Sequence, residues 1–338
     1  MNTSLIIATL GDQVLVEQKF SMIDFLVGNG ITRFRVNLSR YSDKEDFKKR
    51  CEFVKKMKEM YKSRISIMAD LPFPYEKIRI YRINDYCIEV VKDETFIVTS
   101  NKEVYEGNNK SFYSNFPNIA NIVSVNQRLI YADGESTFTV IDLDIVKRYV
   151  VLKANKDCCI YSGKSLSCGK VQDCRLPFEY MKDCIADMKP DSIALSFVSS
   201  PNEVNRLKNA LKGFQGKVYS KIETQGGVDN IIDISKCSNI IIARGDLVLN
   251  TEYYNLLEVQ KCIVSAAREN GVEVIVATGI LPSMVENDVP VQSDIIDVAT
   301  IIDLNVDGMI INYKLVQSKN ITKVLDLVNK ISFDSARF

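Results

Sequence analysis

The sequence predicts an α/β protein, a (β/α)8 TIM barrel with a small all-β lid domain inserted after the third strand. Short runs rich in β-branched residues alternate with amphipathic segments of helical length, which is typical of parallel α/β architecture. Eight such runs occur, and eight strand–helix units favour a closed barrel over an open sheet. One interval, 75–172, breaks the alternation with strand and turn patterns only, and it is the predicted lid.

The predicted elements follow the chain in order. Barrel strands are expected at Leu5–Leu10, Arg33–Leu38, Ile65–Asp70, Ser192–Phe197, Lys217–Ile222, Asn239–Ala243, Glu273–Ala277 and Gly308–Ile311. Helices are expected at Val16–Asn29, Lys44–Tyr61, Pro201–Lys212, Gly227–Ser235, Leu256–Asn270, Ser293–Leu304 and Ile321–Ile331, with another near Pro177–Met188. Within the insertion, strands are expected at Tyr86–Val91, Thr95–Thr99, Ile122–Val125, Thr137–Val140 and Tyr149–Leu152.

The predicted domains are therefore a barrel of residues 1–74 and 173–338 and a lid of residues 75–172. Without the insertion the chain keeps about 240 residues, close to the roughly 250 of a typical barrel of this kind. Loops that follow barrel strands open on the carboxyl face, where barrel enzymes hold their active sites. An insertion in such a loop can exclude water from the reacting groups.

The composition excludes several function classes. The 338 residues contain 43 Lys and Arg against 43 Asp and Glu, so the net charge is zero and no basic field attracts nucleic acid or anionic lipid. The chain has no histidine, which removes the commonest general base near neutral pH and the commonest metal ligand. Chemistry must come from other side chains, and a bound metal would have oxygen ligands, as Mg2+ does.

The cysteines and the apolar runs predict a cytoplasmic protein. Nine cysteines form no Cys-x-x-Cys pair, which favours reduced thiols. The first residues carry no basic leader, and no apolar run reaches the ~18 residues of a membrane helix. We expect no nucleic-acid partner and no membrane partner.

The candidate catalytic residues follow three neighbouring strands. Lys221 and Glu223 stand two residues apart at the end of the fifth strand, which puts both on one side. Asp246 follows the sixth strand and Thr278 the seventh. A carboxylate pair beside an ammonium group can hold a divalent cation and stabilise an oxyanion. Taken singly, each feature has a plainer explanation, a solvated Lys–Glu pair or an Arg-Gly-Asp turn, but three adjacent strand ends favour a site.

These segments resemble a known family. Residues 221–228 (Lys-Ile-Glu-Thr-Gln-Gly-Gly-Val), 243–247 (Ala-Arg-Gly-Asp-Leu) and 277–284 (Ala-Thr-Gly-Ile-Leu-Pro-Ser-Met) are similar to signature segments of pyruvate kinases. Residues 7–11, 35–39 and 194–198 agree with the same family in order and spacing. The resemblance covers almost the whole chain. It implies a barrel with an inserted β lid and transfer of a phosphoryl group between phosphoenolpyruvate and a nucleoside diphosphate.

The resemblance also implies roles for individual residues. Lys221 corresponds to the lysine that contacts the transferring phosphoryl group and the enolate oxygen, and Arg35 to an arginine that contacts phosphate. Glu223 and Asp246 correspond to the ligands of Mg2+ (or Mn2+). Thr278 corresponds to the threonine near the face on which the enolate is protonated.

Further positions correspond to binding sites of the family. The backbone of four consecutive residues would hold the substrate carboxylate: Ala243, Arg244, Gly245 and Asp246. Three residues match the ligands of a monovalent cation: Asn37, Ser39 and Asp70. Because the resemblance aligns Lys77 with a lysine that accompanies independence from potassium, we expect that K+ is not required.

Departures from the family concentrate on the nucleotide side. A nucleotide-contacting histidine is replaced by Arg40, and the usual Ser-Gly-Glu-Thr after the eighth strand is Asn-Tyr-Lys-Leu at 312–315. The candidate nucleotide contacts are Arg40, Arg79 and Lys170, although a lysine at the edge of a lid is by default solvated.

Three functions follow from these patterns. The first is a minimal pyruvate kinase acting on phosphoenolpyruvate and ADP. The second is a repurposed enzyme that handles a pyruvate enolate with another phosphate acceptor or none, and the third is a non-catalytic homologue. Because the chain stops soon after the predicted eighth helix, we expect no carboxyl-terminal regulatory domain and a monomer or homodimer.

Overall fold

The chain folds into two compact units. The structure is a computed structural model that describes residues 5–38, 44–71, 78–82, 87–106, 110–114, 116–132, 134–167 and 178–335. One unit comprises Met1–Pro74 together with Arg175–Phe338, and the other comprises Tyr75–Cys174. The second unit is thus an insertion in the first, after strand β3 (Ser66–Leu71).

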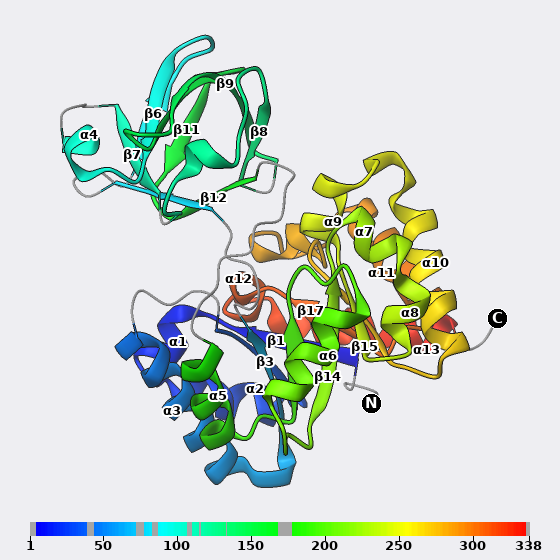
Figure 1. The fold of residues 1–338 in the computed structure, drawn as a ribbon. Coiled ribbons are helices and arrows are strands. Elements are labelled where there is room, and N and C mark those ends of the chain that lie inside the picture. The colour runs from blue at the N-terminus through cyan, green and yellow to red at the C-terminus, as the bar shows by residue number, and fades with distance from the viewer. Residues whose placement is uncertain are drawn as a thin grey trace. The chain divides into compact units, whose positions relative to one another are not determined.

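The first unit is a closed barrel of eight parallel strands, which confirms the predicted fold class (Figure 1). Around the barrel the order is β1-β17-β16-β15-β14-β13-β3-β2. Beyond β3, the strands are β1 (Ile6–Leu10), β2 (Arg33–Asn37), β13 (Ser192–Leu195), β14 (Lys217–Ile222), β15 (Asn239–Ala243), β16 (Val274–Ala277) and β17 (Gly308–Ile311). Strand β1 pairs with both β2 and β17, which closes the barrel.

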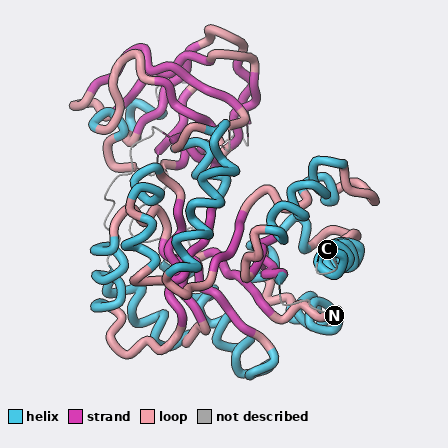
Figure 2. The backbone as a smooth tube through the Cα atoms, turned by 90° about the vertical axis from the view of Figure 1, so that its right-hand side faces the viewer, coloured by secondary structure: helices cyan, strands magenta, loops and turns pink. Residues whose placement is uncertain are grey.

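Helices cover the outside of this barrel (Figure 2). They are α1 (Asp12–Val16), α2 (Phe20–Gly28), α3 (Lys44–Tyr61), α5 (Phe178–Met188), α6 (Pro201–Ala210), α7 (Gln225–Asp229), α8 (Ile231–Ser235), α9 (Arg244–Asn250), α10 (Leu256–Glu269), α11 (Gln292–Asp303), α12 (Tyr313–Val316) and α13 (Ile321–Ser335). Short 3-10 turns lie at η2 (Lys62–Arg64), η4 (Tyr253–Asn255) and η5 (Pro282–Val285). None of the described helices combines the length and the apolarity needed to cross a bilayer.

The side chains that fill the interior of the barrel indicate which residues point toward its mouth. A separate cluster of buried side chains comes from seven strands and fills the interior: Ile7, Met68, Ala194, Tyr219, Ile241, Ala243, Ile275, Ala277 and Ile310. Because strand side chains alternate in direction, residues two positions further on point the same way. Past Met68, Ala194 and Tyr219, those residues are Asp70, Ser196 and Lys221. The interior layer is therefore apolar, and polar groups follow it at the carboxyl end.

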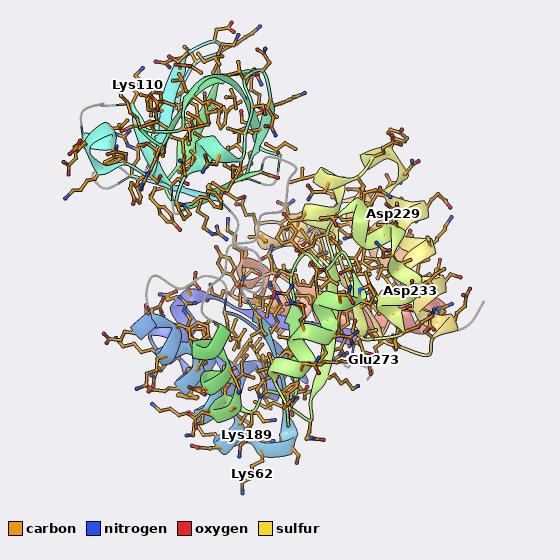
Figure 3. The ribbon with its side chains drawn as sticks, viewed as in Figure 1. Lys62, Lys110, Lys189, Asp229, Asp233 and Glu273 are labelled. Carbon is orange, nitrogen blue, oxygen red and sulfur yellow. The ribbon has the colours of Figure 1, made fainter. Side chains whose placement is uncertain are left out.

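The opposite end of the barrel is held by a second set of polar contacts. Glu273, labelled in Figure 3, precedes β16 and accepts hydrogen bonds from Lys217 (2.5 Å) and from the hydroxyl of Tyr219. Arg33 Nη1 donates to the carbonyl of Asp307 at 2.8 Å. Apart from Tyr219, which lies within β14, these residues begin or precede strands, so the contacts link the amino ends of β14 and β16 and those of β2 and β17.

The second unit is a smaller β barrel. Its strands close in the order β10-β6-β7-β4-β12-β8-β9, with β5 and β11 forming a separate two-stranded sheet. The strands are β4 (Arg79–Tyr81), β5 (Cys87–Val90), β6 (Thr95–Thr99), β7 (Ser111–Ser114), β8 (Arg128–Tyr131), β9 (Ser136–Asp144), β10 (Tyr149–Ala154), β11 (Cys158–Tyr161) and β12 (Lys164–Ser167). One short helix, α4 (Lys102–Glu106), and a 3-10 turn, η3 (Ile119–Asn121), interrupt them. The predicted strand Ile122–Val125 is wrong, because these residues follow η3 as turn and coil.

Candidate active site

Two basic side chains meet one buried carboxylate at the carboxyl ends of β2, β3 and β14. Asp70, at 2% exposure, accepts hydrogen bonds at Oδ2 from Nε and Nη2 of Arg35, at 2.9 and 2.5 Å. The ammonium of Lys221 lies 3.5 Å from the same oxygen. Arg35 Nη1 also donates to the hydroxyl of Thr9 at 3.2 Å, so β1 joins the arrangement.

Lys221 links Asp70 to a second carboxylate. Its Nζ lies 3.2 Å from Oε1 of Glu223 and donates to the hydroxyl of Ser196 at 3.0 Å. The side chain of Lys221 is 14% exposed and that of Glu223 is 2% exposed, so this ion pair is shielded from solvent. The two residues lie on one side of the chain, as their spacing predicts.

The other oxygen of Glu223 is held by strained backbone. The N–H of Phe197 donates to Oε2 at 2.6 Å, and Phe197 has a φ of +54°. A bulky residue in the left-handed region costs about 1–3 kcal/mol and persists only where surrounding contacts impose it. The hydrogen bond from the Phe197 N–H therefore orients the Glu223 carboxylate.

The charges of this cluster stabilise one another. Burial on its own would raise the pKa of Asp70, but Lys221 and Arg35 outweigh burial and hold that pKa below its ordinary value. Burial would lower the pKa of Lys221, but Asp70 and Glu223, with a smaller contribution from Asp246, raise it above its ordinary value. Both groups are therefore charged at neutral pH, and Asp246 lies close enough to Lys221 to act on it.

The segment that carries Asp246 is tied to Glu223 through one amide. Nδ2 of Asn250 donates to the backbone carbonyls of Glu223 (3.1 Å) and Asp246 (2.8 Å). Helix α9 begins at Arg244, directly after β15, and so places Asp246 in its first turn. The two candidate metal ligands thus sit on adjacent strand ends that share a hydrogen-bond donor.

Thr278 lies beside the same segment. A Cβ built on Gly245 would stand 2.9 Å from Cγ2 of Thr278, so only glycine allows this approach. Thr278 has a φ of +76°, and its carbonyl accepts a hydrogen bond from Nε of Arg244 at 2.9 Å. The β16 loop and the start of α9 are therefore in direct contact.

The donor set fits a magnesium ion. Mg2+ is commonly held by one or two carboxylates, with water and substrate oxygens completing its shell. Glu223 and Asp246 supply that number. Among the described residues no cluster of three or more Asp, Glu or Cys side chains could hold a metal by itself. A metal at this place would therefore need substrate or water as further ligands.

Some of the remaining predicted site residues are described by the structure and others are not. Asn37 lies opposite Asp70 in the register of β2 and β3, so these two monovalent-cation candidates are neighbours. Arg79 belongs to the second unit, where its Nη1 donates to the carbonyl of Gly163 at 3.0 Å. Ser39, Arg40 and Lys170 lie outside the described residues.

Comparison with known proteins identifies the family. The model of the pyruvate kinase barrel domain matches residues 1–312, which include every strand of both units. The chain belongs to the pyruvate kinase family. A pyruvate kinase of Mycoplasma pneumoniae is 29% identical over 322 residues, covering 90% of this chain and 62% of the relative.

Two other pyruvate kinases are similarly related. The enzyme of Thermoplasma acidophilum is 29% identical over 351 residues, covering 98% of this chain and 60% of the relative. That of Thermotoga maritima is 26% identical over 346 residues, covering 100% and 72%. The chain thus spans 60–72% of the length of these pyruvate kinases.

Sequence reasoning assigned no role to several residues that hold the site of this pyruvate kinase family member. Ser196 and Phe197 lie in a segment that resembles the family, but their contacts to Lys221 and Glu223 cross 25 and 26 residues. Asn250, one helical turn after Asp246, and Asp297, the partner of Arg244, were also missed. Only the i, i+4 spacing of Asn250 from Asp246 offered a signal in the sequence.

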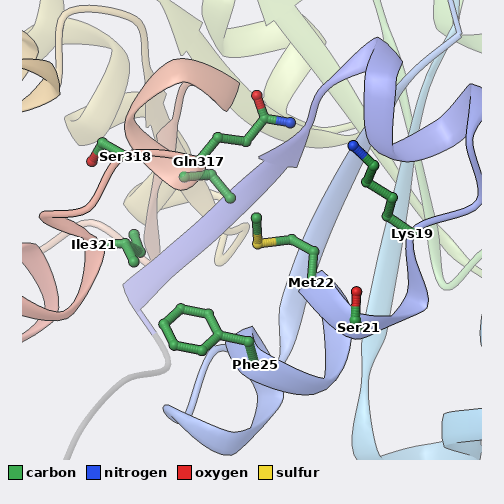
Figure 4. Close-up of a pocket in the computed structure, with 8 residues that line it drawn as sticks. Lys19, Ser21, Met22, Phe25, Gln317, Ser318 and Ile321 are labelled. Atoms are coloured by element: carbon green, nitrogen blue, oxygen red, sulfur yellow. The ribbon is translucent and has the colours of Figure 1, made fainter.

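A pocket elsewhere on the barrel is not a candidate for this chemistry. It has a volume of about 260 Å³ and lies between α2 and the α12–α13 connection, where Met22, Phe25 and Ile321 line it (Figure 4). None of the predicted site residues contributes to it.

Proposed function

We propose that the chain catalyses the Mg2+-dependent transfer of the phosphoryl group of phosphoenolpyruvate to ADP, giving pyruvate and ATP. The observation that carries this proposal is the convergence of Lys221, Glu223, Asp70 and Arg35 at the mouth of the barrel, with Asp246 close by. Membership of the pyruvate kinase family supports the same chemistry. Phosphoryl transfer depends on positioned cations more than on a general base, so a chain without histidine can perform it.

Each residue has a task in the proposed reaction. Glu223 and Asp246 would hold Mg2+ (or Mn2+), which supplies charge neutralisation at the phosphate and enolate oxygens when bound. Arg35 and Lys221 stabilise the negative charge that the transferring phosphoryl group carries on its equatorial oxygens. Lys221 then faces the enolate oxygen left on the three-carbon product. Thr278 stands at the edge where C3 of the enolate takes up a proton.

The backbone after β15 binds the substrate in this proposal. The N–H groups of Ala243–Asp246 surround the start of α9, where Gly245 allows a substrate carboxylate to approach the main chain. The resemblance assigns the role of a lid to the inserted unit and a nucleotide contact to Arg79, and its other candidate nucleotide contacts, Arg40 and Lys170, lie outside the described residues.

We also propose that K+ is not required. Oδ2 of Asp70 is occupied by the guanidinium of Arg35, and Oδ1 has no hydrogen-bond partner among the described residues. The resemblance aligns Lys77, which lies outside the described residues, with the lysine that accompanies independence from potassium. Initial rates with Na+ and with K+ at equal ionic strength test this, and a large rise in rate with K+ would contradict it.

A coupled assay with phosphoenolpyruvate, ADP and Mg2+ tests the proposed function. We expect turnover that Lys221→Ala abolishes. Lys217→Ala is the matched control, because Lys217 lies on the same strand at the other end of the barrel and pairs with Glu273. Turnover should survive in that control.

The same assay separates the alternatives. No turnover with any nucleoside diphosphate would overturn the proposal. Exchange of the C3 protons of pyruvate without phosphoryl transfer would then point to an enzyme that handles the enolate alone, and failure to bind Mg2+ with oxalate, a pyruvate-enolate analogue, to a non-catalytic homologue.

A further inference from the structure

Three residues of the loop that follows β16 lie in the left-handed region, and two of them are not glycine. Thr278, Gly279 and Leu281 have φ values of +76°, +75° and +46°. Residues other than glycine rarely adopt this region, and they keep it only where neighbouring groups impose it. Three left-handed residues among four consecutive ones therefore require an external support.

The guanidinium of Arg244 supplies that support. Arg244 is 8% exposed, and its Nε donates to the carbonyl of Thr278 at 2.9 Å. A Cβ on Gly279 would lie 3.3 Å from Nη2 of Arg244, so the guanidinium also packs against the next residue of the loop. The cation of Arg244 thus contacts two of these three left-handed residues.

Helix α11 holds that guanidinium in place. Asp297 accepts from Nη1 and Nη2 of Arg244 at 2.5 and 2.8 Å, a bidentate pair that leaves Nε pointing at the loop. One turn earlier, the buried Asp294 accepts from the hydroxyl (2.6 Å) and the N–H (3.1 Å) of Ser283. The first turns of α11 therefore fix the loop from both ends.

The loop in turn contacts the substrate-binding segment. Cγ2 of Thr278 lies against Gly245, which directly follows Arg244 and precedes Asp246. A shift of the Arg244 side chain would therefore move Thr278 relative to both residues.

We propose that Arg244 and Asp297 are positioning residues that hold the strained loop so that Thr278 stays against Gly245. Their ion pair sets the rate of turnover and leaves substrate affinity nearly unchanged. This inference rests on the proposed phosphoryl-transfer function. The competing explanation is that the pair stabilises the fold and nothing more.

Two variants and one control separate these explanations. Arg244→Lys keeps a cation facing Asp297, but a single ammonium cannot make the bidentate pair and the bond to the Thr278 carbonyl together. Asp297→Asn keeps the shape of the partner and removes its charge. Asp303→Asn makes the same chemical change at an exposed position at the end of the same helix.

Steady-state kinetics and melting temperature give the first readout. We expect Arg244→Lys and Asp297→Asn to lower kcat about 10- to 100-fold. The KM for phosphoenolpyruvate should stay within about threefold of wild type, and Arg244→Lys should keep the wild-type melting temperature. Asp303→Asn should match wild type throughout. An unchanged kcat in Arg244→Lys, or losses of kcat that follow the melting temperature in all three variants, would overturn the proposal.

Hydrogen exchange of the loop amides gives a readout that does not depend on activity. Residues 278–285 should exchange faster in Arg244→Lys than in wild type or Asp303→Asn, with the rest of the barrel unchanged. If wild type shows no turnover, the proposed function fails. Faster exchange of residues 278–285 in Arg244→Lys would still show that Arg244 holds the loop. Equal exchange in all proteins would overturn that role whether or not the enzyme is active.

Discussion

The two sides of the barrel mouth hold their functional groups by different means. On the β2, β3 and β14 side, Arg35, Asp70, Lys221 and Glu223 are joined by ion pairs of 2.5 to 3.5 Å and are largely buried. On the β15 and β16 side the backbone itself is strained, and one guanidinium anchored outside the barrel keeps it in place.

Because of this difference, the two sides should be sensitive to different substitutions. A buried network of opposite charges is sensitive to the loss of any one charge, because the others are left uncompensated. A strained loop is sensitive to the geometry of its hydrogen bonds, and removal of the strain itself stabilises the fold.

Glu223→Gln should have the largest effect on activity. The substitution removes a proposed metal ligand and one partner of Lys221, so we expect kcat to fall about 10²- to 10³-fold. The Mg2+ concentration for half-maximal rate should rise. Both are measured by titrating Mg2+ in the coupled assay.

The control for this variant lies at the opposite end of the barrel. Glu273 also pairs with a lysine of β14, Lys217, and Glu273→Gln makes the same chemical change there. We expect this variant to keep the wild-type kcat. Equal losses of kcat in Glu223→Gln and Glu273→Gln would show that the charge pairs act only on the fold.

Asp70→Asn should destabilise the protein in a pH-dependent way. At neutral pH the variant leaves Arg35 and Lys221 without their shared carboxylate, which costs about 3 kcal/mol of the free energy of unfolding. Because the pKa of Asp70 is lowered, its contribution is complete above the ordinary value of 3.8 and is lost as the pH falls through the folded-state pKa.

The contribution of Lys221 to the free energy of unfolding changes with pH in the opposite direction. Because the pKa of Lys221 is raised, its contribution is complete below the ordinary value of 10.5 and is lost as the pH rises through the folded-state pKa. Urea unfolding at several pH values should therefore give a constant difference between wild type and Asp70→Asn from about pH 5 to about pH 9. A difference that does not shrink below pH 3.8 would contradict the role of the Asp70 charge.

Arg35→Lys should have a smaller effect on the same side. The lysine keeps the charge, but it cannot bond both Asp70 and Thr9 as the guanidinium does. We expect kcat/KM for phosphoenolpyruvate to fall about tenfold. Arg33→Lys, two residues earlier on β2, is the control, and an equal loss there would remove the distinction between the two ends of the strand.

The sequence alone predicted the barrel because its strands are buried on both faces. Continuous β-branched runs bounded by polar residues located Lys217–Ile222, Asn239–Ala243 and Gly308–Ile311 with the bounds that the structure shows. Helix continuity was harder to predict. The segment Val16–Asn29 was expected as one helix, but Gln18 adopts a φ of +50° between α1 and α2. Nothing in the side chain of glutamine indicates that conformation.

The candidate site was predictable only in part for a related reason. The two-residue spacing of Lys221 and Glu223 on a strand placed both at the mouth. The groups that orient the site depend on tertiary contacts, such as the bond from the N–H of Phe197 to Glu223 and the bond from Arg244 to Asp297 across 53 residues. No local sequence pattern indicates such contacts, because a polar residue that is buried against a partner looks the same in the sequence as one on the surface.

Thr278→Gly should change stability by less than Asp70→Asn does, and the signs of its effects on stability and activity should be opposite. Relief of left-handed strain gains about 1–3 kcal/mol, and the extra freedom of glycine in the unfolded chain costs about 0.5–1 kcal/mol. We therefore expect the free energy of unfolding to rise by up to about 2.5 kcal/mol. The kcat should fall, because the side chain beside Gly245 is lost.

Gly279→Ala, one residue further along the chain, should change the free energy of unfolding in the opposite direction. It places a Cβ at a φ of +75°, 3.3 Å from the guanidinium of Arg244, so it should lower the free energy of unfolding by about 1 kcal/mol. Chemical denaturation of the two variants side by side measures both shifts. If Thr278→Gly destabilises as much as Gly279→Ala, the loop stores no strain at Thr278, and the β15 and β16 side would depend on side-chain contacts alone.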